Sequence, residues 1–266
     1  MAATTETQVC NQALLKMGQA PIDDIDGTDV QEEKCAIIYD EVRDACLCEG
    51  PEDGWEFAKF TYHEIDRESF TITAFAQATA TTTTVTATHT LVAGDKVEIT
   101  GTTNYDGTYK VESVSTTVSF VITKTYVADD ATGTAYWTSN EYAYRYALPT
   151  CLMVLRVTSG GIQLTDWKER GAYILTNQES TEVDMDIVQS VTTVTLFPSY
   201  FVEYLTVRLA IELHYNLTQD LNAIQLLQQE LEIKKNKAFA MDQRRLYQQE
   251  KSTAWVDAGH NTDFIE

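Results

Sequence analysis

Most features that mark membrane, secreted or disordered proteins are missing from this sequence. It contains only four prolines in 266 residues. No apolar run approaches the roughly 18 residues that a membrane-spanning helix needs. The opening residues, Met-Ala-Ala-Thr-Thr-Glu, lack the basic and apolar regions of a signal peptide. With 44% hydrophobic and 22% charged residues, the composition is typical of a folded protein made in the cytoplasm, without contact with a membrane.

A disulfide framework is also missing. The five cysteines form an odd-numbered set without regular spacing, which indicates reduced thiols. Cys46 and Cys48 have a spacing that could begin a zinc site, but no second cysteine pair accompanies them. We therefore expect helix cysteines and no bound metal.

No catalytic signature is present. Glycine-rich nucleotide loops, nucleophile elbows and His-Glu-x-x-His motifs do not occur, and the four histidines are scattered. Asp184 and Asp186 share a predicted strand face, where alternation with apolar residues explains them as solvent-facing. The aspartates between residues 23 and 29 lack the glycine and terminal glutamate of a calcium loop. We expect neither an enzyme nor a cofactor.

Positive charge is scarce. Lys and Arg number 19 against 40 Asp and Glu, so the net charge is −21, and residues 1–66 alone hold 16 acidic and 4 basic side chains. Binding to a phosphate backbone needs clustered Lys and Arg, so this surface argues against a grip on nucleic acid. It is compatible with repelling DNA, with binding a basic protein partner, or with an acidic face that only maintains solubility.

Helical patterns dominate both ends of the chain. A capping box at Thr5 to Gln8 opens a first helix that stops at Gly18, and a second helix runs from residue 28 to Gly50. Over residues 197–250 the apolar residues recur at helical spacing, in two arms joined at residues 218–220. The second arm, about 30 residues or ~45 Å long, is long for a compact domain and predicts a rod that packs against several partners.

The middle of the chain changes character. From residue 67 to residue 138, Thr, Val, Ala, Tyr and Gly dominate, and short alternating segments are separated by turns such as Asn104-Tyr-Asp-Gly107. About six short strands fit a small β-barrel or sandwich. Aromatic segments flank this region on both sides, as expected for a domain inserted into a loop.

The predicted fold class is α+β: a helical bundle with a long helical hairpin and a small antiparallel sheet, carrying an inserted all-β domain. Residues 1–66 and 139–250 form one discontinuous domain, whose β part lies at 151–190. Residues 67–138 form the inserted domain, and 251–266 form a C-terminal docking tail.

Several segments then match a known family in order along the chain. They are Trp55-x-Phe57, the run from Tyr144 to Val157 (YRYALPTCLMVLRV), the run from Gly171 to Asn177 (GAYILTN), the run from Phe197 to Glu203 (FPSYFVE), and Ser252-x-x-Trp255. Together they cover nearly all of the discontinuous domain and resemble the tail tubular protein A type of head–tail adaptor from short-tailed phages. Residues 67–138 fall outside the family pattern, and Gly259-His260 stands where an arginine is more typical.

This resemblance implies a virion protein of the phage tail or neck, with twelve copies in a ring between the portal and the tail nozzle. Genome DNA passes through the centre without specific binding, and we expect acidic side chains to face that channel. The interface candidates lie in the helical hairpin and the tail: Tyr200, Phe201, Tyr204, Leu205, Trp255 and Val256. The first four are expected to pack the domain core while the hairpin presents its outer faces to neighbours, and the tail around Trp255 is expected to engage the portal or an adjacent protomer. Strands at 151–188 are expected to meet the nozzle.

Two alternatives stay open. One is an adaptor or completion protein of a long-tailed phage, whose helical scaffold would be similar. The other is a receptor- or glycan-binding virion protein that uses residues 67–138.

Overall fold

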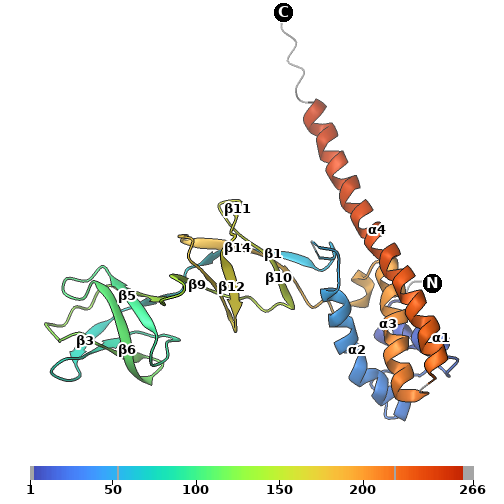
Figure 1. Cartoon of the computed structure of the whole chain (residues 1–266), viewed down its shortest axis with the longest axis horizontal. Coiled ribbons are helices and arrows are strands. Elements are labelled where there is room, and N and C mark those ends of the chain that lie inside the picture. Colours follow the sequence, from blue (N-terminus) through green and yellow to red (C-terminus); the bar gives the residue numbers. More distant parts are fainter. Residues whose placement is uncertain (1–2, 53, 219, 260–266) are drawn as a thin grey trace, which may run out of the picture. The chain divides into compact units, whose positions relative to one another are not determined.

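The structure is a computed structural model that describes residues 3–52, 54–218 and 220–259, with side chains described as far as residue 245. The chain divides into two compact units, both drawn in Figure 1. Unit 1 comprises Met1–Phe60, Cys151–Leu155 and Ile187–Glu266, and unit 2 comprises Thr61–Thr150 and Arg156–Asp186.

The predicted fold class is wrong in its main feature. Over the described residues the chain forms fourteen strands in three antiparallel sheets and only four α-helices, so most of its elements are strands and it is not a helical bundle with a long hairpin and a small sheet. Only its mixed α+β character agrees with the prediction. Seven of the strands lie outside residues 67–138: five of them fall in the β part predicted at 151–190, and those at 59–66 and 144–147 lie outside it.

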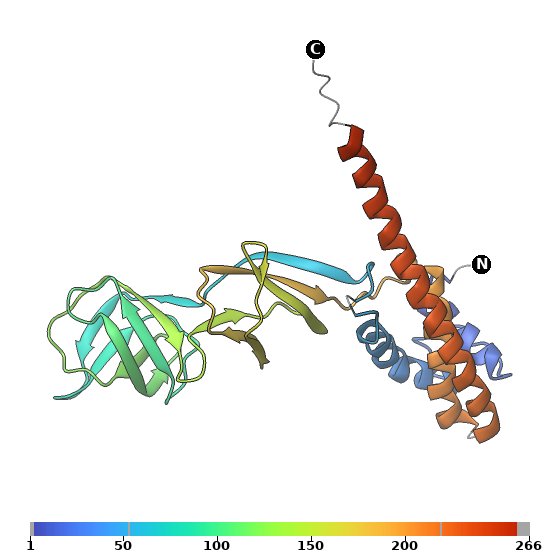
Figure 2. The ribbon, with the colours of Figure 1, turned by 45° about the horizontal axis from the view of Figure 1, so that its top comes forward.

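Unit 1 contains all four α-helices. Their bounds are α1 Glu6–Lys16, α2 Val30–Cys48, α3 Ser199–Leu217 and α4 Leu221–Gly259, with a short 3-10 turn η1 at Val194–Leu196 before α3. The Thr5 hydroxyl caps α1 by accepting a hydrogen bond from the Gln8 amide at 3.2 Å. At the start of α2, the Asp29 amide donates to the Glu32 carboxylate at 3.0 Å. α3 contacts each of the other three helices, and in Figures 1 and 2 α2 and α4 lie on different sides of it.

An aromatic cluster around Trp55 forms the centre of unit 1. The Trp55 ring is fully buried and lies 5.4 Å from the Phe201 ring and 5.3 Å from the Phe239 ring, both edge-on. Its indole N–H donates to the Cys46 carbonyl at 2.9 Å, so the ring also ties the end of α2 to the core. The preceding Gly54 has φ +75°, a left-handed conformation that favours glycine, and a Cβ there would lie 2.9 Å from the Leu155 side chain.

A seven-stranded sheet forms the larger part of unit 2. Its order is β2-β8-β5-β6-β7-β4-β3. The bounds are β2 Ser69–Thr71, β3 Ala74–Gln77, β4 Thr83–Thr86, β5 Lys96–Thr100, β6 Gly107–Thr116, β7 Ser119–Ile122 and β8 Thr134–Thr138. The long β6 pairs with β5 along its first half and with β7 along its second, and two register shifts in the second pairing bend the sheet. The inward side chains close a core in which Phe75 and Tyr105 stack at 4.0 Å.

The remaining strands form two small sheets. A three-stranded sheet in unit 2 has the order β12-β13-β9, from β9 Tyr144–Ala147, β12 Trp167–Arg170 and β13 Tyr173–Thr176. A four-stranded sheet has the order β1-β14-β10-β11, from β1 Lys59–Asp66, β10 Met153–Ser159, β11 Ile162–Gln163 and β14 Glu182–Val188. The predicted domain boundaries at 66/67, 138/139 and 250/251 differ from the bounds of the two units and stay a prediction. Within the described residues, no helix is both long and apolar enough to cross a membrane.

Candidate functional site

The predicted interface residues of α3 lie inside unit 1. Phe201, Tyr204 and Leu205 are 0% exposed, and Tyr200 is half-buried. A partner would therefore contact other residues of these helices. The side chains of Trp255 and Val256 lie outside the described residues, so their expected interface function also stays a prediction.

Two tyrosine hydroxyls of α3 connect it to neighbouring elements. Tyr204 donates to the Glu49 carboxylate at 2.6 Å, and Tyr200 donates to the Asp242 carboxylate of α4 at 2.6 Å. Burial raises the pKa of the Tyr204 hydroxyl far above its ordinary value, and the nearby Glu49 raises it further. Both tyrosines therefore stay protonated at neutral pH and act as hydrogen-bond donors that fix helix positions.

One face of α4 packs against the rest of unit 1. Its buried residues recur at spacings of three, four and seven: Ile224, Leu227, Leu231, Ala238 and Asp242. At the border of this face, Lys234 and Lys237 form ion pairs with Glu203 of α3, at 2.9 and 3.1 Å. These two lysines hold the pKa of the Glu203 carboxyl below its ordinary value. The first half of α4 is thus firmly attached to α3.

The opposite face of α4 exposes large apolar side chains. Leu226 and Ile233, seven residues apart and each 68% exposed, lie on one line of the helix surface, which we call the outer stripe. Between them, Glu230 pairs with Lys16 of α1 at 2.5 Å. Leu15, beside that lysine, is 63% exposed. The seven-residue spacing of Leu226 and Ile233 is visible in the sequence, but the spacing does not show that this face of the helix is exposed.

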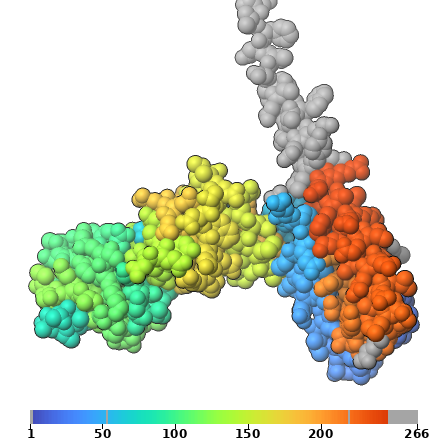
Figure 3. All heavy atoms as spheres, in the orientation of Figure 1, coloured from blue at the N-terminus to red at the C-terminus, as the bar shows by residue number. Residues whose placement is uncertain are grey.

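A groove lies between α2 and α3 on the same unit. It has a volume of about 230 Å³, and its sides carry apolar and charged residues of both helices: Ile38, Glu41, Val42, Ala45, Arg208 and Glu212. The Arg208 guanidinium lies 3.6 Å from Glu212 and 4.0 Å from Glu49, so one cation is shared by two carboxylates. We call this the α2–α3 groove. Figure 3 shows that α2 and α4 both reach the surface of unit 1, where they border different sides.

These two helices have opposite charge. α2 carries five acidic and two basic side chains, whereas residues 221–245 of α4 carry five basic and three acidic ones. In a chain with net charge −21, this part of α4 is therefore unusually basic.

Unit 2 contains two arginines that are each inserted between two aromatic rings. The Arg67 guanidinium lies 4.3 Å from the Tyr136 ring centre and 4.6 Å from that of Tyr144. Arg145 lies 4.7 Å from the Trp137 ring centre and 4.2 Å from that of Tyr173. In each case one ring belongs to β8 of the seven-stranded sheet and the other to the three-stranded sheet. The arginines therefore join the two sheets of this unit by cation–π contacts.

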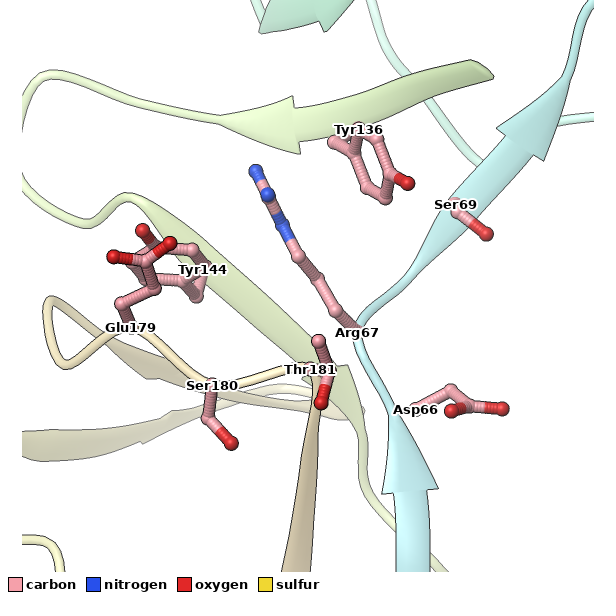
Figure 4. Close-up of a pocket in the computed structure, with 8 residues that line it drawn as sticks. All are labelled: Asp66, Arg67, Ser69, Tyr136, Tyr144, Glu179, Ser180 and Thr181. Carbon is pink, nitrogen blue, oxygen red and sulfur yellow. The ribbon is translucent and has the colours of Figure 1, made fainter. Parts of the chain in front are cut away.

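A hollow of about 420 Å³ adjoins Arg67. Figure 4 shows Arg67 pointing between the two tyrosine rings, with Glu179 beside Tyr144 and Asp66 directed away from them. The other lining residues carry hydroxyl groups: Ser69, Ser180 and Thr181. A second hollow of about 420 Å³ shares Ser69 and continues along threonines of β2, β4 and the adjoining turns. The lining is polar, with two carboxylates, one paired arginine and many hydroxyls.

Metal-binding and catalytic groups are dispersed. In the part of the chain that the structure describes, no three His, Cys, Asp or Glu side chains gather in a way that could hold a metal ion. His63 lies 3.4 Å from Asp184 on the surface of unit 2, while His89 and His214 are buried. His260 lies outside the described residues. No disulfide links the five cysteines.

No protein-family model fits the chain, and no curated protein matches its sequence. The resemblance to tail tubular adaptors therefore remains an interpretation of the quoted segments.

Proposed function

We propose that this chain is a structural subunit of a phage head–tail adaptor, which assembles into a ring of about twelve copies between the portal and the tail nozzle of the virion. The observation that supports this proposal best is the outer stripe of α4. A helix that exposes two large apolar side chains on the face opposite its own core is suited to pack against another protein surface.

The length of α4 supports the same conclusion. At 1.5 Å per residue, a 39-residue helix is ~58 Å long, about twice the length of the 19-residue α3. Because α3 can lie beside only about half of α4, the remainder needs other surfaces to pack against. A subunit held between neighbours in a ring supplies such surfaces.

The charge of the chain suits a conduit for DNA. With 40 acidic and 19 basic residues, the surface does not offer the clustered cations that hold a phosphate backbone. Genome DNA would pass such a ring without being retained, and acidic side chains would face the channel.

Electron microscopy of the purified chain, alone and mixed with the portal protein of the same phage, tests this function. The expected result is a ring with a central hole that docks beneath the portal. A chain that stays monomeric in both samples, at concentrations well above those of the portal, would overturn the proposal. A ring that also recruits the nozzle protein would distinguish this adaptor from one of a long-tailed phage.

A second candidate function is favoured by the two hollows of unit 2. Tyrosine rings, carboxylates and hydroxyls in an open polar hollow suit a saccharide, whose hydroxyls both donate and accept hydrogen bonds. A glycan array probed with the purified chain tests this function. Binding that Tyr144→Ala abolishes and that Val92→Ala leaves intact would favour it, and an array without any positive glycan would remove it.

A further inference from the structure

We infer that the outer stripe of α4 binds the α2–α3 groove of a second copy of this chain, so that successive copies associate head to tail. This inference rests on the proposed ring and names the two surfaces that close it. Three observations support it: apolar character, charge and position.

The two surfaces have matching apolar character. Leu226 and Ile233 project from α4 and are each 68% exposed, while the groove is lined by Ile38, Val42 and Ala45. Another exposed apolar residue, Ile37, is 74% exposed on α2 beside the groove. Seating a leucine or isoleucine in such a groove removes apolar surface of both partners from water, which is worth roughly 25 cal/mol per Å².

Their charges are complementary. The groove is bordered by Glu41 and Glu212, and its one cation, Arg208, is already shared by two carboxylates. The stripe continues toward Arg244, which is exposed and lies eleven residues, or about three turns, after Ile233. Lys234, Lys235 and Lys237 of α4 are paired with Glu203 and Glu49 of their own chain, so the charge that α4 offers to the acidic α2 of a second copy comes from Arg244. Two acidic α2 helices would repel each other.

The positions of the surfaces favour a ring. The stripe lies on the face of α4 opposite its buried residues, and the groove lies between α3 and α2. In Figures 1 and 2, α2 and α4 lie on different sides of α3. A contact between two different surfaces of identical subunits is heterologous, and it generates a closed ring when the rotation between copies closes. A contact of the stripe with itself would stop at a dimer.

The test uses two complementary variants of the full chain. The stripe variant is Leu226→Asp with Ile233→Asp, and the groove variant is Ala45→Arg, which fills the groove. Glu41→Arg is a second groove variant that changes only an exposed side chain, so the test does not depend on the folding of Ala45→Arg. Leu196→Asp is the matched control, because Leu196 is 61% exposed in unit 1 but lies outside both surfaces.

Light scattering after size exclusion gives the assembled mass, with portal rings added as a template if the wild-type chain alone is monomeric. We expect wild type and Leu196→Asp to assemble fully, and each variant alone to lose assembly. An equal mixture of stripe and groove variants retains one intact pair of surfaces, so it should form dimers of about twice the 29.9 kDa chain and nothing larger.

Contrary outcomes separate the two proposals. Assembly of both variants to the wild-type mass would overturn the assigned surfaces and leave the ring itself intact. A groove variant that dimerises alone, with a monomeric stripe variant, would show that the stripe binds itself and would also overturn the inference. A wild-type chain that assembles neither alone nor on portal rings would overturn the proposed function.

Discussion

Arg145 differs from the lysines and the other arginines of unit 2 in being buried. The side chain of Arg145 is 8% exposed and that of its partner Glu68 is 13% exposed, and the arginine also donates to the Thr90 hydroxyl at 3.0 Å. A buried ion pair adds little net stability by itself, but removing one partner leaves a charge in a medium that solvates it poorly. The contribution of Arg145, Glu68 and Thr90 to the stability of unit 2 is therefore best measured by a substitution that removes one partner.

Arg145→Met is expected to destabilise unit 2 by about 3 kcal/mol, because it leaves Glu68 uncompensated and removes two cation–π contacts. The control is Arg170→Met. Arg170 and Glu141 are 3.3 Å apart with side chains 58% and 57% exposed, so that pair should contribute less than about 1 kcal/mol. Urea unfolding followed by tryptophan fluorescence measures both, and equal shifts of the two midpoints would contradict the assigned role of the cluster.

A buried carboxylate on α4 is the second residue with a specific expected effect. Asp242 is 0% exposed and accepts hydrogen bonds from the Tyr200 hydroxyl at 2.6 Å and from the Glu56 amide at 3.2 Å. Asp242→Ala leaves both donors without this acceptor, which should cost about 2 to 3 kcal/mol. The exposed neighbour change Gln243→Ala should leave the thermal midpoint unchanged. A similar midpoint for all three proteins would show that Asp242 does not attach α4.

At the scale of elements, the attachment of α4 to α3 should depend on pH. The lysines at 234 and 237 lower the pKa of Glu203, so the folded state favours its charged form. The stabilisation is present above the ordinary carboxyl pKa of 4.5 and is lost as the pH falls through the lowered folded value. Because Glu203 is 41% exposed, the effect should stay below about 1 kcal/mol.

Glu203→Gln is the matched variant for this dependence. Other carboxylates also titrate in acid, so the quantity to measure is the difference in unfolding free energy between wild type and Glu203→Gln. That difference should favour wild type at pH 6 and shrink toward pH 3. A difference that stays constant over this range would mean that Glu203 does not contribute through its charge.

The sequence predicts elements with local patterns and misses those that depend on distant pairing. The hydroxyl of Thr5 and the stop at Gly18 define α1 from sequence, and the observed helix ends at Lys16. By contrast, β11 is only two residues long and β12 is largely exposed, so neither shows an apolar alternation. β1 and β14 are neighbours in one sheet although more than 100 residues separate them. The alternation at residues 183–188 predicts the strand β14 but not its pairing with β1, and β11 and β12 have no local period that could reveal them.

The candidate site could be predicted only in part, for a related reason. The periodicity of α3 correctly marks Phe201 and Leu205 as apolar positions, but periodicity alone does not show whether an apolar face meets the chain's own core or a partner. The structure buries both residues completely and leaves Leu226 and Ile233 exposed. Which apolar face of a helix stays exposed depends on how α1, α2 and α4 pack against α3. This packing is tertiary structure, which helical periodicity does not contain.

At the scale of the whole molecule, the net charge of −21 predicts weak interaction with DNA. Basic DNA-binding proteins hold non-specific duplex with Kd values of about 10⁻⁴ to 10⁻⁶ M at physiological salt, mainly through counterion release. This chain should bind a fluorescent duplex more weakly than that range, in fluorescence anisotropy at low and at physiological salt. Tight binding that weakens steeply with salt would reveal a basic surface and contradict a freely passing genome.

The seven-stranded sheet of unit 2 should fold when it is separated from the rest of the chain. Its strands all lie between Ser69 and Thr138, and fourteen of the fifteen buried residues in its core cluster lie in that range, with Leu175 as the exception. Ser69 pairs with Tyr136 in adjacent strands, so the two ends of the segment are close together, as an inserted domain requires.

We therefore expect residues 67–138, expressed alone, to unfold cooperatively on heating. The stability should be modest, because a domain of this size buries a small core and the separated segment lacks Arg145 and Tyr173. Phe120→Asp is the control: Phe120 is 0% exposed in this core, so the variant should be unfolded and should lose the thermal transition. Circular dichroism distinguishes the outcomes. If the wild-type segment is already unfolded, the seven-stranded sheet depends on the three-stranded sheet, and the arginine contacts between them are required for folding as well as for attachment.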